Sequence, residues 1–132
     1  MRCFIDSNIL ISSGLFPKSV PAKALLKALT LPNVAIISDY SLDETHRVIN
    51  KKFPDRVADL ELFIYRTLFA VELISTPTDD ENNIVVRDAD DIPIVRAALA
   101  ASADVLITGD KDLLESGITE PLILTAAEFL RT

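Results

Sequence analysis

The sequence is poor in residues on which several classes of protein depend. It has one cysteine, Cys3, one histidine, His46, and three isolated glycines, Gly14, Gly109 and Gly117. A lone cysteine forms no internal disulfide, which favours the reducing cytoplasm. One histidine and one cysteine leave both a Cys/His zinc site and Cys/His nucleophilic catalysis unsupported. Isolated glycines exclude a glycine-rich phosphate loop.

The chain also lacks long hydrophobic runs and an excess of basic residues. No apolar run approaches membrane-spanning length, and Asp6 stands where a signal peptide would need apolar residues. Thirteen basic and twenty acidic residues give a net charge of −7, whereas nucleic-acid-binding domains are generally basic. These absences predict a cytoplasmic protein without a membrane segment, and they argue against tight nucleic-acid binding in the absence of metal ions.

What the chain does have is a regular alternation of short apolar runs and helical patterns, typical of a parallel α/β architecture. The predicted strands are residues 2–5, 34–37, 71–74, 105–107 and 122–124. The predicted helices are residues 7–15, 20–31, 41–53, 56–69, 91–102, 113–116 and 126–130. The pattern predicts one domain, residues 1–132, folded as a three-layer α/β/α sandwich around a parallel sheet of about five strands.

Acidic residues follow strands or open helices at four separate places. Asp6 follows the first predicted strand, and Asp110 follows the fourth. Glu44 lies early in the helix 41–53, and Asp91 opens the helix 91–102. An open parallel sheet has its ligand crevice at the carboxyl ends of its strands. Four carboxylates gathered there could not all ionise without cations. Hard oxygen ligands favour Mg²⁺ or Mn²⁺, so the sequence predicts a divalent-metal site.

Each of these acids also has an ordinary structural interpretation. Asp6 is a suitable N-cap for the helix that begins at residue 7. Ser41 and Glu44 have the spacing of a capping box. One of the acids at 88–91 suits the cap of the next helix, and Asp112 suits the cap of the turn after Asp110. Both interpretations stay open at this stage.

The neighbours of the acids offer further candidates. Asn8 is either an amide that supports a ligand or a turn residue, and Thr108 either hydrogen-bonds a ligand or closes its turn. Gly109 allows the chain to turn sharply after the strand. Asp88 belongs to the acidic stretch 79–91, where Asp79, Asp80, Glu81, Asp88, Asp90 and Asp91 accompany a single base, Arg87.

Taken together, these positions resemble the PIN-domain family. The resemblance rests on apolar-Asp6-Ser-Asn8, on Leu-x-Glu44 in a helix, on Asp91 opening a helix, and on Leu-Ile-Thr-Gly-Asp110-Lys-Asp112-Leu. It covers essentially the whole chain and is closest to the VapC-like toxins of prokaryotic toxin–antitoxin pairs.

The resemblance implies an α/β/α ribonuclease that uses Mg²⁺ or Mn²⁺. The catalytic and metal-binding residues it implies are Asp6, Glu44, Asp91 and Asp110, with Asp112 as a further metal ligand and with Asn8, Thr108 and Asp88 as accessory residues. The partners it implies are an RNA substrate, an antitoxin protein and a second copy of the chain. Metal-activated hydrolysis would leave a 5′-phosphate and a 3′-hydroxyl.

A basic stretch after Glu44 is the predicted RNA contact, although an ordinary solvated helix face explains it equally well. It consists of Arg47, Lys51, Lys52 and Arg56. Two other functions also stay open. A phosphoacceptor or phosphotransferase domain gathers Asp and Mg²⁺ in a similar sheet, but Asn8 stands where an Asp-x-Asp pair would need its second acid. A non-catalytic scaffold could use Leu15 and Phe16 as a partner surface.

Overall fold

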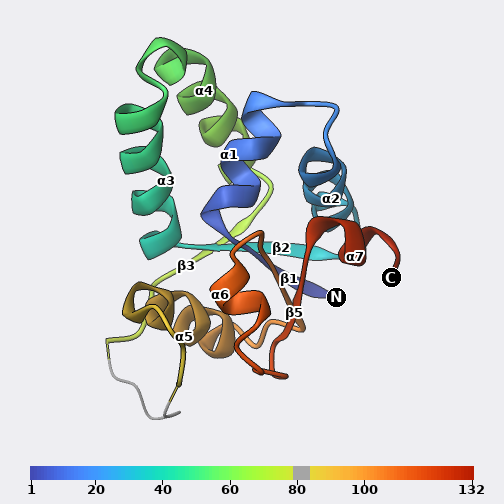
Figure 1. Cartoon of the computed structure of the whole chain (residues 1–132). Coiled ribbons are helices and arrows are strands. Elements are labelled where there is room, and N and C mark those ends of the chain that lie inside the picture. The colour runs from blue at the N-terminus through green and yellow to red at the C-terminus, as the bar shows by residue number, and fades with distance from the viewer. Residues whose placement is uncertain (79–83) are drawn as a thin grey trace.

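A five-stranded, all-parallel sheet forms the centre of the computed structural model, which describes residues 1–78 and 84–132 (Figure 1). The strand order is β3-β2-β1-β4-β5. The strands are β1 (Arg2–Ile5), β2 (Val34–Ser38), β3 (Glu72–Ile74), β4 (Val105–Ile107) and β5 (Leu122–Leu124). The predicted α/β/α sandwich and the five predicted strands are confirmed. Asp79, Asp80 and Glu81 lie outside the described residues.

Helices cover both faces of the sheet (Figure 1). They are α1 (Ser7–Leu15), α2 (Val20–Leu29), α3 (Asp39–Lys52), α4 (Val57–Leu68), α5 (Ile92–Ala100), α6 (Lys111–Leu114) and α7 (Ala126–Leu130), with short 3-10 turns η1 (Pro54–Arg56) and η2 (Ala89–Asp91). Helices α5 and α6 lie on one side of the sheet, and the other helices lie on the opposite side or at its margin. None of the helices in the described residues has the length and apolar character needed to cross a membrane.

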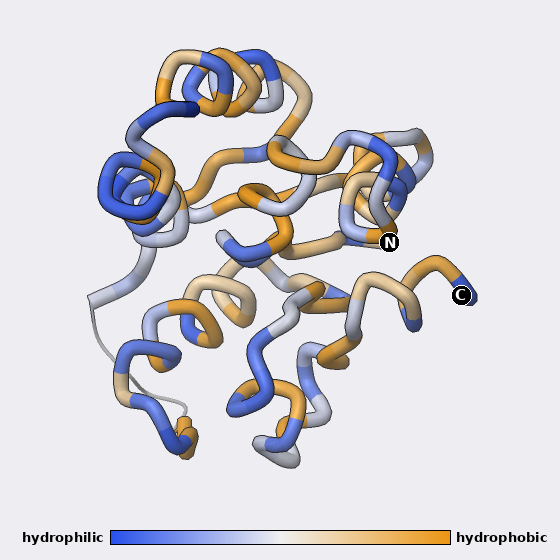
Figure 2. The backbone as a smooth tube through the Cα atoms, turned by 45° about the horizontal axis from the view of Figure 1, so that its top comes forward, coloured by the Kyte–Doolittle hydropathy of each residue, from blue (hydrophilic) through white to orange (hydrophobic). Residues whose placement is uncertain are grey.

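Alternation along the strands builds a separate core on each face of the sheet. Phe4, Ile36 and Leu106 point toward α5 and α6, whereas Cys3, Ile5 and Ile107 belong to the core under α1, α2, α3, α4 and α7. Figure 2 shows hydrophobic residues along the central strands and hydrophilic ones on the outer turns of α3. On α5, Ala97, Ala98 and Ala101 are buried as the small-residue face predicts, but Ala100 is exposed.

Five of the seven helices, α2 to α6, differ in their bounds from the sequence prediction, and the reason is identifiable for α3 and α2. Helix α3 begins at Asp39 because Ser38 caps it, its hydroxyl accepting the backbone N–H of Ser41 at 3.1 Å. The predicted capping box of Ser41 and Glu44 is therefore wrong, which leaves the Glu44 carboxylate available for another role. Helix α2 ends at Leu29 rather than at residue 31, since a residue that precedes a proline is disfavoured in helical conformation.

Gly14 on α1 lies close against side chains of α4. A Cβ atom at this position would lie 2.9 Å from Cδ2 of Leu60 and 2.9 Å from Cδ1 of Phe63. We expect Gly14→Val to lower the free energy of unfolding by about 2 kcal/mol through overpacking, measured by urea denaturation. Ala58→Val, at an exposed position of α4, is the control for the cost of a β-branched residue in a helix. Equal stability of the two variants would contradict the prediction.

Candidate metal and nuclease site

The candidate site lies where the direction of strand addition reverses. From β1 the chain first builds outward through β2 and β3, and it then returns to add β4 and β5 on the other side of β1. Asp6 leaves β1 and residues 108–110 leave β4, and the backbone N–H of Asp6 donates to the carbonyl of Ile107 at 3.1 Å. Open α/β sheets bind their ligands at such a switch point.

Asp6 is held there by three hydrogen bonds. The side chain is 2% exposed. Its Oδ1 accepts the backbone N–H of Ser7 at 2.8 Å, and its Oδ2 accepts the hydroxyl of Thr108 at 2.7 Å and the amide of Asn8 at 3.2 Å. Asp6 is therefore the N-cap of α1, as one interpretation predicts, and its carboxylate also stands at the switch point. The two roles coexist.

Burial raises the pKa of Asp6 to about 6. The hydrogen bonds from Thr108 and Ser7 act in the opposite direction, because they stabilise the carboxylate. The negative charges of Glu44 and Asp110 raise the pKa further. Three of the four predicted acids are thus electrostatic neighbours at this edge of the sheet.

Asp91 is the second buried acid of the site and the least satisfied one. It is 4% exposed, and its Oδ2 is buried without a hydrogen bond. Asp91 occupies the N-cap position of α5, but its side chain makes no capping hydrogen bond. The capping side chain of this segment is that of Asp88, which accepts the backbone N–H of Asp90 at 2.9 Å at the start of η2. Burial raises the pKa of Asp91 to about 7, followed by the charges of Asp110, Asp88 and Asp6. A buried carboxylate oxygen without a donor is open to a cation.

Carboxylate oxygens from three residues converge around Asp91. Oxygens of Asp88, Asp91 and Asp112 lie within 4.8 Å of one another, and within residues 1–78 and 84–132 no other three acidic, cysteine or histidine side chains come so close. Asp6, Glu44 and Asp110 are not members of this tight group. Asp88, predicted as an accessory residue, thus lies nearer to Asp91 and Asp112 than its sequence position suggested.

The turn after β4 is fixed from both sides. The hydroxyl of Thr108 accepts the backbone N–H of Asp110 at 3.0 Å, and Oδ1 of Asn8 accepts that of Gly109, also at 3.0 Å. Asp110 caps α6 by accepting the backbone N–H of Asp112 at 2.9 Å, so the expectation that Asp112 is the cap is wrong. Gly109 is not in the left-handed region, and a Cβ there would meet only Asn8, at 3.6 Å or more. The turn after β4 therefore does not need the conformational freedom of glycine at this position.

Two residues that sequence reasoning missed connect the site to α3. Ser7 donates its hydroxyl to Oε1 of Glu44, and Tyr40 donates its hydroxyl to the carbonyl of Asp90 at 3.1 Å. The pKa of Tyr40 is raised by burial and then by the charge of Glu44. Neither residue carries a sequence signal, because each meets its partner across 37 or 50 positions of the chain.

The predicted RNA contacts, Arg47, Lys51, Lys52 and Arg56, are all exposed. Arg47 and Lys51 follow Glu44 by three and seven residues and share its helix face, whereas Lys52 is turned aside. Lys51 lies about 10 Å farther along the axis of α3 than Glu44. Arg56 lies beyond the helix, with its Nε 3.4 Å from Oδ2 of Asp59.

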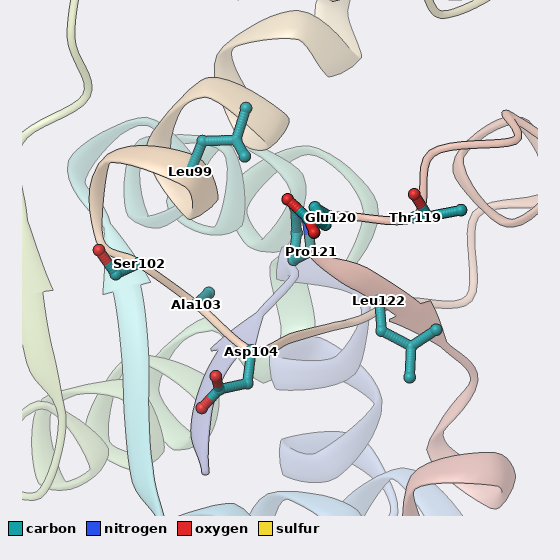
Figure 3. Close-up of a pocket in the computed structure, with 8 residues that line it drawn as sticks. All are labelled: Leu99, Ser102, Ala103, Asp104, Thr119, Glu120, Pro121 and Leu122. Carbon is teal, nitrogen blue, oxygen red and sulfur yellow. The ribbon is translucent and has the colours of Figure 1, made fainter.

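A cavity of about 390 Å³ lies elsewhere, at the amino edge of the sheet (Figure 3). It is lined by Leu99, Ser102, Ala103, Asp104, Thr119, Glu120, Pro121 and Leu122. Its two acids do not converge in Figure 3, and the Asp104 carboxylate accepts the backbone N–H of Arg2 at 2.7 Å. The residues that line this cavity do not include any of the acids gathered at the carboxyl ends of β1 and β4.

The fold and the buried carboxylates of Asp6 and Asp91 define a class of protein. It is an α/β/α domain with acids at the switch point of a parallel sheet. The chain belongs to the PIN domain family, whose sequence model matches residues 2–112. The resemblance inferred from the sequence is thereby confirmed.

Solved structures of VapC-type proteins share this fold. VapBC2 from Rickettsia felis, solved with a DNA fragment from its promoter, is 16% identical with a TM-score of 0.69, over 95% of this chain and 98% of that one. VapC20 of Mycobacterium tuberculosis, a toxin that cleaves the sarcin–ricin loop, is 15% identical with a TM-score of 0.63, over 88% and 95%. No curated protein sequence matches the chain. At such low identity, the likeness shows a common fold.

Proposed function

We propose that the protein is a metal-dependent ribonuclease that hydrolyses RNA phosphodiester bonds, and that it acts as the toxin of a toxin–antitoxin pair. The observation that carries the proposal is Asp91, a buried carboxylate at the switch point with an oxygen that has no hydrogen-bond donor. Membership of the PIN domain family supports it. VapC20, which shares the fold, cleaves the sarcin–ricin loop.

The acids at the carboxyl ends of β1 and β4 and around Asp91 fit a divalent cation. The donor set consists of carboxylate oxygens, the ligands of Mg²⁺ and Mn²⁺. Asp91 with Asp88 and Asp112 forms the tight part of the site, and Asp6, Asp110 and Glu44 complete it from β1, β4 and α3. A divalent cation held there supplies Lewis acidity, which activates water and neutralises charge on the phosphate.

The surrounding residues fix these carboxylates in place. Thr108 and Asn8 hold Asp6, and Ser7 holds Glu44. Asp6 and Asp91 ionise only above their usual range, so cation binding near neutral pH releases their protons. The one histidine, His46, lies with its Nδ1 2.7 Å from Oε2 of Glu61, so we assign the proton of the attacking water to the carboxylates.

The partners follow from the same proposal. RNA would contact Arg47 and Lys51 on the face of α3 that carries Glu44, with Lys52 and Arg56 beyond them. An antitoxin partner is supported by VapBC2, which was solved with promoter DNA. We further propose that residues 1–132 form a single domain that acts in the cytoplasm as a homodimer.

The proposal is tested by the end groups of the products. Mixed single-stranded RNA incubated with the protein and Mn²⁺ is expected to give fragments with 5′-phosphate and 3′-hydroxyl ends, because water is the nucleophile. End-labelling and mass spectrometry identify the ends. EDTA and an Asp6→Asn/Asp110→Asn double variant are the controls. Products with 2′,3′-cyclic phosphate would overturn the mechanism, because they show attack by the RNA's own 2′-hydroxyl.

A further inference from the structure

Arg87 is an exposed cation beside the acids of the candidate site. It directly precedes Asp88, and it is the one base of the stretch 79–91. Its side chain is 64% exposed. The guanidinium nevertheless has a defined place, since it pairs with two acids of the neighbouring α6 segment.

The two ion pairs of Arg87 are unequal. Nη2 lies 2.6 Å from Oε2 of Glu115, whereas Nε lies 3.4 Å from Oδ1 of Asp112. The first is a close, charge-assisted hydrogen bond, and the second is an ion pair that is too long for one. Asp112 also belongs to the tight group with Asp88 and Asp91. The guanidinium is thus anchored by Glu115 with one edge turned to the candidate metal ligands.

Stability does not explain this arrangement well. Ion pairs between exposed side chains contribute little to the free energy of folding. Among the contacts of the described residues, Nη1 of Arg87 makes no hydrogen bond. A planar guanidinium with free donors is suited to bidentate recognition of phosphate. RNA that approaches the acids of the candidate site meets mostly negative charge, so a cation beside these acids would attract the RNA phosphates.

We propose that Arg87 is a substrate-binding residue that binds an RNA phosphate beside the acids of the candidate site, with Glu115 holding its guanidinium in place. The inference rests on the proposed ribonuclease function and adds a substrate-binding residue to it. The ion pair with Asp112 gives way to phosphate at little cost because it is long, whereas the hydrogen bond to Glu115 persists.

The experiment compares Arg87→Gln, Arg87→Lys and Lys23→Gln, all in a Glu44→Gln background that keeps the RNA intact. Lys23 is exposed on α2, and its replacement changes the net charge as Arg87→Gln does. Fluorescence anisotropy measures the affinity for a labelled single-stranded RNA in Mn²⁺ at several salt concentrations. A separate titration measures the affinity for Mn²⁺.

We expect Arg87→Gln to weaken RNA binding about tenfold, the size of one charge-assisted hydrogen bond, and Arg87→Lys to recover part of the loss. The slope of log affinity against log salt should fall by about 0.7 for one lost phosphate contact. The affinity for Mn²⁺ and the RNA affinity of Lys23→Gln should change less than about twofold, as expected away from the contact.

Equal RNA affinity of Arg87→Gln and its parent would overturn the inference. So would an equal loss in Lys23→Gln, which would reduce the effect to net charge. A fall in Mn²⁺ affinity with an unchanged salt slope would also overturn it, because Arg87 would then only anchor the loop that carries Asp88. Failure of the proposed function is distinguishable, since it appears as a wild-type chain that cleaves no RNA.

Discussion

Asp6→Asn is expected to reduce RNA cleavage by about a thousandfold, the scale on which loss of an essential catalytic group acts. The variant removes a negative charge beside Glu44 and Asp110. It also leaves an amide N–H₂ group against one of the donors that now serve the carboxylate, Ser7, Asn8 and Thr108. The rate is measured as initial cleavage of single-stranded RNA at saturating Mn²⁺.

Asp55→Asn is the matched control, because Asp55 is exposed in η1 and, among the described residues, belongs to no acidic group of the site. It should cleave at nearly the wild-type rate. Circular dichroism and thermal unfolding show whether Asp6→Asn is folded, and Asp110→Asn gives a second variant should it not be. A folded Asp6→Asn protein that retains most of its activity would remove Asp6 from the catalytic residues.

The metal-free protein is expected to lose stability as pH rises from about 4 to about 7. The folded state holds the protons of Asp6 and Asp91 up to pH values of about 6 and about 7, whereas an unfolded chain releases them near pH 4. The folded state therefore binds more protons in this interval, so the free energy of unfolding falls as the pH rises. Above about pH 7 the folded protein bears the full free-energy cost of the two buried, ionised carboxylates. Binding of Mn²⁺ should offset this cost.

Asp91→Asn tests the origin of this cost. Without the charge, metal-free protein at pH 8 should be more stable than the wild type, by on the order of 2 kcal/mol, and should gain less stability from Mn²⁺. Urea denaturation at pH 5 and pH 8, with EDTA or with Mn²⁺, measures both effects. Asp90→Asn, at the exposed neighbour, should resemble the wild type. An Asp91→Asn protein that is less stable at pH 8 would contradict the electrostatic interpretation.

The fold was predictable because its signals are local. Each strand contains a short apolar run, and Ser7–Leu15 and Ala126–Leu130 have the predicted helix boundaries. The errors also have local causes. Ser38, and not Ser41, caps α3, because the chain passes directly from β2 into the helix. Nothing in the spacing of the two serines distinguishes these outcomes.

The candidate site was predictable only in part. Parallel strands place their carboxyl ends together, so the proximity of Asp6 and Asp110 follows from the predicted topology. The distances among Asp88, Asp91 and Asp112 depend instead on how η2 and α6 pack, and the sequence carries no trace of that. Contacts such as that of Ser7 with Glu44 are likewise products of tertiary packing.

The most direct test of the proposed metal site is a crystal of the protein soaked in Mn²⁺ and measured at a wavelength where manganese scatters anomalously. We predict an anomalous peak at the carboxyl ends of β1 and β4, at about 2.0–2.6 Å from carboxylate oxygens, with Asp91 among the ligands. A crystal with bound Mn²⁺ elsewhere, or with none at millimolar concentration, would contradict the proposal that these acids form a metal-dependent nuclease site.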